Sequence, residues 1–218
     1  MALTTLPTAA LANDAVDNTK LNLADNYAFT GTVTGASDII KLSTTTVTTD
    51  VSSVDFEVFN TTYPYYIIKI ANARPDATGN TYGLAMRIKE GGSYQTGSNY
   101  EVSRNRVYQS YPSSWTHNGS GYTSDYPSLS MGTNSSGNGY SAFATHFNIL
   151  IHNPTDDTGQ FSKSIYCESW GGSDLGRTAI HHVSFTWSGN QNDWEGIRFR
   201  YGAGNIADGI FTIYGVKN

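Results

Sequence analysis

The stretch Gly204-Asn-Ile-Ala-Asp-Gly-Ile-Phe-Thr-Ile-Tyr-Gly-Val-Lys-Asn218 decides the fold class. A Gly-containing turn leads into a run whose side chains alternate between two sets, Ile210, Thr212, Tyr214 and Val216 on one side and Phe211 and Ile213 on the other. β-Branched and aromatic residues at a period of two are typical of a β-strand. Because both sets are largely apolar, we expect this strand to be covered on both sides and to lie inside a sheet.

The run at residues 194–201 immediately precedes this strand, and we expect it to be the partner of the closing strand. In this run Ile197, Phe199 and Tyr201 alternate with Arg198 and Arg200. The alternation predicts a strand with one buried and one exposed face.

Strand-like runs separated by turn signals fill the rest of residues 37–218. Before the two closing runs they lie at 38–48, 54–59, 65–71, 82–89, 100–109, 140–152, 161–170 and 178–187. We expect loops at 72–80 and 109–139 and a turn at Gly91-Gly92. Short turns without a helical pattern predict an all-β body, a β-sandwich of jelly-roll type with about ten strands.

The composition favours the same class and excludes several partners. Of the 218 residues only 14% are charged, while 22 are Gly and 15 are Tyr. The net charge of -5 gives no basic surface, so we expect no nucleic-acid partner. No apolar run approaches membrane-spanning length, and the first residues lack the charged start of a secretory signal. We therefore expect the protein to be made in a cytoplasm and not to insert into a membrane.

Residues 1–36 differ from the body and are predicted to form an extended N-terminal arm. Apolar side chains recur every few residues without helical or strand spacing. They are Leu3, Leu6, Leu11, Val16, Leu21 and Leu23. A solvated, disordered tail needs fewer apolar residues, so an arm that orders against a partner fits this composition better.

Four stretches occur in an order that resembles virion appendage proteins of marine-type phages. They are Leu-Pro-Thr-Ala-Ala-Leu-Ala-Asn-Asp-Ala-Val-Asp-Asn-Thr-Lys-Leu at 6–21, Tyr-Tyr-Ile-Ile-Lys-Ile-Ala-Asn-Ala-Arg-Pro at 65–75, Leu-Ala-Met-Arg-Ile-Lys-Glu-Gly-Gly-Ser-Tyr at 84–94 and Gly-Ile-Phe-Thr-Ile-Tyr-Gly-Val-Lys at 209–217. The resemblance is to tail-fibre and head-fibre proteins with a jelly-roll β-sandwich.

This resemblance implies a non-enzymatic virion structural protein that is assembled in the host cytoplasm. It implies a homotrimer, anchored to other virion proteins by the arm and contacting the host surface. Two alternatives remain open. A capsid decoration (cement) protein or head fibre has the same parts, and a soluble carbohydrate-binding module is a different class with the same fold.

The titratable residues predict no catalytic residue, no metal site and no cofactor. His181 and His182 are neighbours in a strand and point to opposite faces, so they cannot share one metal. His146 and His152 share a face but lie six residues apart. We expect the lone Cys167 to be a buried, unreactive thiol. No nucleophile, acid–base or nucleotide-binding motif appears.

The expected loop at 109–139 is the candidate binding segment. It holds Tyr111, Trp115, Tyr122 and Tyr126 among Ser, Gly, Asn and Thr. Aromatic residues provide rigid contact area and small polar residues adapt to a partner, so the composition is typical of a binding loop. Three roles remain open for these aromatics: contact with a host receptor or glycan, packing on the protein's own sandwich, and packing on a neighbouring subunit.

Overall fold

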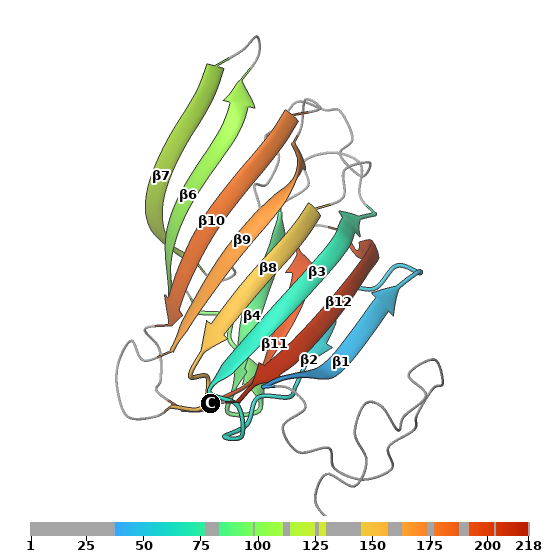
Figure 1. Cartoon of the computed structure of the whole chain (residues 1–218), viewed down its shortest axis with the longest axis vertical. Helices are drawn as coiled ribbons and strands as arrows, with labels where there is room; N and C mark the ends of the chain where they lie inside the picture. Colours follow the sequence, from blue (N-terminus) through green and yellow to red (C-terminus); the bar gives the residue numbers. More distant parts are fainter. Residues whose placement is uncertain are drawn as a thin grey trace, which may run out of the picture. The chain divides into compact units, whose positions relative to one another are not determined.

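The structure is a computed structural model of the chain. It describes residues 38–76, 83–97, 99–110, 114–124, 127–129, 145–156, 163–173, 177–187, 192–202 and 204–217. All regular elements in this part of the chain are β-strands (Figure 1). They are β1 (Ile39–Val47), β2 (Val54–Phe56), β3 (Tyr65–Pro75), β4 (Leu84–Glu90), β5 (Ser93–Tyr94), β6 (Tyr100–Ser110), β7 (Ser114–Ser124), β8 (Thr145–His152), β9 (Ser164–Ser173), β10 (Arg177–Trp187), β11 (Trp194–Tyr201) and β12 (Ile206–Val216).

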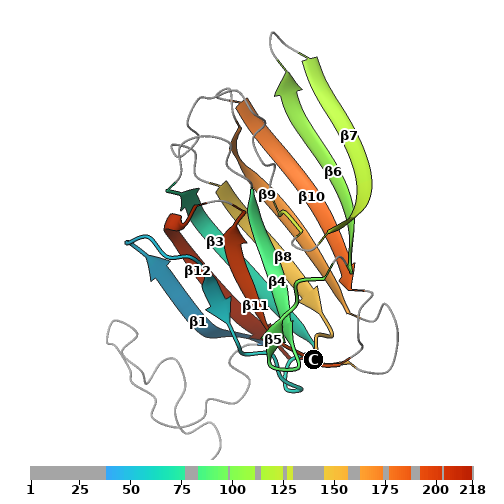
Figure 2. The same ribbon diagram turned by 180° about the vertical axis from the view of Figure 1, so that it is seen from behind.

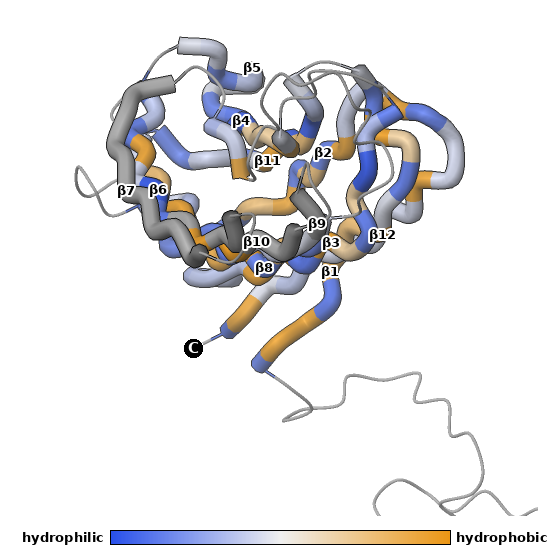
Figure 3. The backbone as a smooth tube through the Cα atoms, turned by 90° about the horizontal axis from the view of Figure 1, so that it is seen from above, coloured by the Kyte–Doolittle hydropathy of each residue, from blue (hydrophilic) through white to orange (hydrophobic). Residues whose placement is uncertain are grey.

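These strands form two antiparallel sheets. The large sheet has the order β1-β12-β3-β8-β9-β10-β6-β7, and the small sheet has the order β2-β11-β4-β5. Seen from behind, β4, β11 and β5 lie in front of the large sheet (Figure 2), and seen from above the sheets form two layers (Figure 3). The predicted all-β, two-layer sandwich is therefore confirmed, and the jelly-roll connectivity stays a prediction.

One core fills the space between the two sheets. Alternate residues of the strands form it, as in β8, where Phe147, Ile149 and Ile151 are buried. Phe199 of β11 contacts Phe211 of β12 with ring centroids 5.9 Å apart, which joins the small sheet to the large one. The inner face of the large sheet is thus the apolar face of the sandwich.

The closing strand β12 lies within the large sheet, as expected, but its partners differ from the prediction. It pairs with β1 on one side and β3 on the other, whereas β11 belongs to the small sheet. Phe211 and Ile213 are fully buried, while Ile210 on the opposite side is 43% exposed. The expected cover on both sides is therefore only partial: on the face of Ile210, Thr212 is buried and Tyr214 and Val216 are half-buried.

The segment 109–139 is not a continuous loop, which corrects the prediction. Residues 114–124 form β7, which pairs with β6 along its whole length in a hairpin at the edge of the large sheet. An edge strand can be rich in Ser, Thr, Gly and Asn, so it lacks the apolar alternation that marks an inner strand. The loop expected at 72–80 was also placed too early, because β3 continues to Pro75. The turn at Gly91-Gly92 is confirmed, with positive φ angles of 59° and 76°.

The predicted arm, residues 1–36, lies outside the described residues, and so do Leu3, Leu6, Leu11, Val16, Leu21 and Leu23. Their role in attachment stays a prediction. In the part of the chain that is described, no helix has the length and apolar character needed to cross a membrane.

Candidate functional site

The outer face of the large sheet, which points away from the core, carries several exposed apolar side chains. Among the described residues, the exposed large hydrophobics are Ile39, Tyr166, Trp170, Ile180 and Ile210. All of them belong to strands of the large sheet. The small sheet has none of them, so the candidate site is on the large sheet.

Several of these residues line up across the sheet. On β12 and β3, Ile210 lies opposite Ala71. Further along, the register runs from His146 of β8 to Trp170 of β9, Ile180 of β10 and Val107 of β6. We call these six residues the outer band. Directly opposite residues on one face are in contact range, so the band is one surface assembled from distant parts of the chain.

An aromatic pair stands at the middle of the outer band. The imidazole of His146 and the indole of Trp170 are nearly parallel, at 16°, with ring centroids 5.9 Å apart. The backbone N–H of Asn72 donates to Nδ1 of His146 over 3.4 Å. Because Nδ1 accepts this bond, a neutral His146 carries its proton on Nε2. Trp170 remains 45% exposed, so the pair offers an aromatic surface to solvent.

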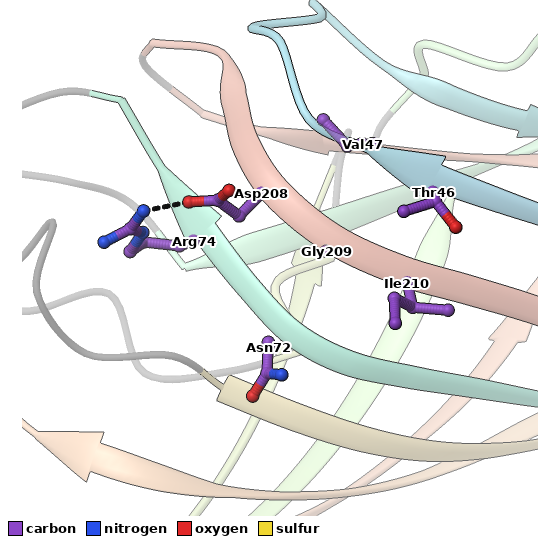
Figure 4. Close-up of a pocket in the computed structure, with 7 residues that line it drawn as sticks. All are labelled: Thr46, Val47, Asn72, Arg74, Asp208, Gly209 and Ile210. Atoms are coloured by element: carbon purple, nitrogen blue, oxygen red, sulfur yellow. Dashed lines mark hydrogen bonds and ion pairs between the residues drawn. The ribbon is translucent and has the colours of Figure 1, made fainter.

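A pocket of about 370 Å³ adjoins this pair, at the end of the sheet where β1, β12 and β3 meet (Figure 4). Its lining residues are Thr46, Val47, Asn72, Arg74, Asp208, Gly209 and Ile210. Arg74 and Asp208 form an ion pair at one side of it, and their side chains are 44% and 40% exposed. The pocket therefore offers a hydroxyl, an amide, a guanidinium and a carboxylate beside the apolar side chain of Ile210.

Backbone irregularities shape the pocket. Between the paired positions Ile70 and Ala73, β3 has one residue more than β8, and between Ala71 and Arg74 it has one more than β12. The extra residue is Asn72, whose φ of 56° is in the left-handed region that Asn tolerates better than most residues. Across the strand pair, Gly209 has a φ of 150°, and a Cβ there would lie 2.8 Å from the ring of Phe211. Glycine is thus required at position 209, while position 72 accepts Asn or Gly.

A second group on the outer face, one row away from the outer band, is polar and satisfied. The phenol of Tyr166 lies 2.8 Å from Nδ1 of His182 and 3.3 Å from the carboxylate of Glu168. Partial burial and the charge of Glu168 raise the pKa of Tyr166, so the phenol stays protonated. These three side chains hydrogen-bond to one another and offer fewer free groups than the pocket.

The exposed side of the small sheet is a network of paired charges. Arg198 binds Asp55 and lies over the ring of Tyr94, with 3.8 Å from its Cζ to the ring centroid. Lys89 binds Glu57 at 2.7 Å, and the phenol of Tyr94 donates to Glu57 at 3.1 Å. Paired charges of this kind serve stability and solubility, so we do not regard this side as the candidate site.

The structure leaves the predicted receptor contacts untested. Tyr111 and Tyr126 lie outside the described residues. For Trp115 and Tyr122 only the backbone of β7 is described, in which they pair with Gln109 and Val102 of β6. Sequence reasoning missed the outer band and the pocket, although one signal was present. In the run at 178–187, Ile180 is an apolar residue on the otherwise polar face, opposite to Val183 and Phe185.

His181, His182 and Cys167 lie where the sequence predicted them. His181 is buried and His182 half-buried on the opposite face of β10. Cys167 is fully buried, and burial raises the pKa of its thiol. In the described part of the chain, no group of three or more His, Cys, Asp and Glu residues could hold a metal ion.

Comparison of the chain with protein-family models, with curated proteins and with solved structures finds no match in any of the three.

Proposed function

We propose that the protein is a non-enzymatic structural protein of a phage virion, a tail-fibre or fibre-like appendage that contacts the host surface through the outer face of its large sheet. The observation that carries the binding role is the outer band with its adjoining pocket. The order of the four sequence stretches at 6–21, 65–75, 84–94 and 209–217 supports the virion assignment.

Exposed apolar side chains gathered on one face mark a surface that another molecule covers. Trp170 and Ile180 are directly opposite each other, and both are 45% exposed. Leaving them in water forfeits roughly 25 cal/mol for each Å² that a partner would bury. Lys69 and Glu168 lie beside the outer band and carry charges. A charged border around an apolar surface favours a specific contact over non-specific association.

The arm and the assembly complete the proposal. Residues 1–36 attach the protein to other virion proteins, with Leu3, Leu6 and Leu11 among the apolar contacts. Three copies form the closed, symmetric appendage. Sedimentation equilibrium of the full chain at micromolar concentration tests the assembly: we expect three times 23.7 kDa, and a clean monomer would contradict it.

Particle composition tests the virion assignment directly. We expect mass spectrometry to find the chain in density-gradient-purified phage particles from the source lysate, and a cryo-EM map to show the body outside the tail or capsid. A phage replication enzyme serves as the negative control in the same fraction. Recovery of the chain only from the particle-free fraction would contradict the proposal.

The pocket and the exposed indole of Trp170 favour a second function, a soluble carbohydrate-binding module. The same particle fractionation separates the two, since a secreted module stays in the soluble fraction. The cryo-EM map distinguishes a tail appendage from a capsid decoration protein, because the body of a decoration protein would lie on the capsid shell.

A further inference from the structure

We propose that the pocket and the stacked His146–Trp170 pair form one saccharide-binding site. This inference rests on the proposed function and deepens it, because it gives the chemical class of the surface ligand and the residues that bind it.

The size and lining of the pocket suit a sugar ring. Its volume of about 370 Å³ is within the range of small-molecule sites. Each hydroxyl group of a pyranose both donates and accepts hydrogen bonds. Thr46 and Asn72 also do both, while Arg74 donates and Asp208 accepts. Ile210 supplies an apolar wall for the C–H groups of the ring.

The indole of Trp170 provides the platform for a second ring. Sugars bury their C–H faces on aromatic rings, whose polar edge remains available for hydrogen bonding. The imidazole of His146 contacts the indole in a nearly parallel arrangement, which holds it in place. A ligand that stacks on Trp170 therefore pays little side-chain entropy on binding.

Asn72 joins the two parts into one site. Its side chain lines the pocket, and its backbone N–H donates to His146, which in turn stacks on Trp170. Two strand spacings of about 4.8 Å separate β3 from β9, so an oligosaccharide with one ring in the pocket crosses His146 and reaches the indole with a later ring. The strand register connects the same elements, β3, β8 and β9, in that order.

The backbone builds this site at a cost, which argues for a function. Non-glycine residues in the left-handed region are uncommon, and such positions cluster at binding sites. Here Asn72 lies at such a position within a β-bulge, and bulges re-aim side chains next to functional sites.

Other ligand classes fit less well. The guanidinium of Arg74 is paired with Asp208, so the pocket offers no free positive charge to a phosphate or a nucleic acid. Asp208 is the pocket's single carboxylate, which is too few ligands for a divalent cation. A neutral polyhydroxyl compound matches both the hydrogen-bonding groups and the absence of net charge.

The test uses the full chain on a glycan array of di- to tetrasaccharides built from neutral hexoses and N-acetylhexosamines. We expect binding to a subset of these glycans, and titration of the strongest binder then measures the affinity of variants. Trp170→Ala should weaken binding by about tenfold or more through loss of stacking. Asn72→Gly should weaken it by about fivefold, because glycine keeps the backbone path and removes the amide.

Tyr166→Ala is the matched control, since Tyr166 is an exposed aromatic on the same strand and face as Trp170. We expect its affinity to stay within about twofold of the unmodified chain. A second measurement needs no truncation: the indole N–H signal of Trp170, assigned with Trp170→Phe, should shift when the glycan is added.

The outcomes separate this inference from the proposed function. Glycan binding that is lost in Tyr166→Ala and unchanged in Trp170→Ala and Asn72→Gly would overturn the site, while host-surface contact would still stand. Failure to bind any glycan on the array would overturn the saccharide class. Particle composition is independent of both results and decides the virion assignment alone.

Discussion

Arg198 binds Asp55 with two hydrogen bonds, from Nε to Oδ1 at 2.8 Å and from the terminal nitrogen to Oδ2 at 2.6 Å. Asp55 is on β2 and Arg198 is opposite it on β11, so the pair ties the short edge strand to the small sheet. Two parallel bonds from one guanidinium give the pair a fixed geometry that single-bond surface pairs lack.

Removing this carboxylate should make the protein less stable at neutral pH and make little difference in acid. Partial burial raises the pKa of Asp55, but the hydrogen bonds and charge of Arg198 outweigh it and lower the pKa overall. The pair's contribution is then full above the unfolded-state pKa of about 3.9 and is lost as the pH falls through the folded-state pKa. Asp55→Asn should cost about 1 kcal/mol at pH 7.

Urea unfolding of the chain and of Asp55→Asn between pH 7 and pH 3 checks this prediction. The difference between their midpoints should shrink as the pH falls. Asp50→Asn, which removes an exposed carboxylate, serves as the control and should change little. A difference that grows in acid would show that the pair has the opposite effect.

We expect the contribution of Glu90 to stability to have the opposite pH dependence. Its side chain is buried at 2% exposure and accepts a hydrogen bond from the indole of Trp187 at 3.1 Å. Burial raises the pKa of Glu90, and the hydrogen bonds from Asn192 and Trp187 and the charge of Lys163 only partly oppose this. A raised folded-state pKa means that the stabilising effect is present below the unfolded-state pKa and is lost as the pH rises.

Glu90→Gln keeps the shape and the acceptor for Trp187 without the charge. We therefore expect the stability of Glu90→Gln relative to the unmodified chain to increase between pH 4 and pH 8, measured by thermal melting. Glu101→Gln, at an exposed glutamate of β6, should leave this profile flat. A relative stability that falls with pH would contradict the direction of the pKa shift.

Gly196 should be a position where one methyl group is not tolerated. A Cβ there would collide with the backbone oxygen of Phe56 and would lie 2.9 Å from Cα of Glu57. Because backbone atoms cannot rotate away, Gly196→Ala should destabilise the protein by about 2 kcal/mol. At Gly97 the nearest atom would be the end of the Asn99 side chain at 3.2 Å, so Gly97→Ala is the control. Equal denaturation midpoints for the two variants would contradict this packing.

Cys167 should react with thiol reagents only when the protein unfolds. Its side chain is fully buried, and burial raises the pKa of the thiol, so little thiolate is available. We expect a colorimetric disulfide reagent to modify one thiol per chain in concentrated guanidinium and none in native buffer over the same time. Rapid modification in native buffer would show that β9 opens locally.

The sequence predicted strands well where one face is buried and the other is solvated. The alternation of Ile197, Phe199 and Tyr201 with Arg198 and Arg200 placed β11 correctly. The alternation could not identify the strands that pair with β12. A period of two shows which side of a strand is buried, and it carries no information about which strands lie beside it in the sheet. The hairpin strand β7 was missed because an edge strand of Ser, Thr, Gly and Asn has no such alternation.

The candidate site was beyond sequence reasoning for a related reason. Asn72, His146, Trp170 and Asp208 come from four strands that are distant in the chain. Their contact depends on the strand order β12-β3-β8-β9 and on the bulge at Asn72, and single-sequence periodicity specifies neither. Trp170 could be assigned to a strand, but the sequence did not show that its side of β9 faces away from the small sheet and stays exposed.

The position of β12 between β1 and β3 affects how the protein forms during translation. On the ribosome, β1 and β3 are synthesised long before the strand that separates them, so this side of the large sheet cannot form until residues 206–216 emerge from the exit tunnel. Pairing across such a long sequence separation is slow. Nascent chains stalled before Ile206 should therefore remain sensitive to protease at β1, because the strand that lies between β1 and β3 is then missing.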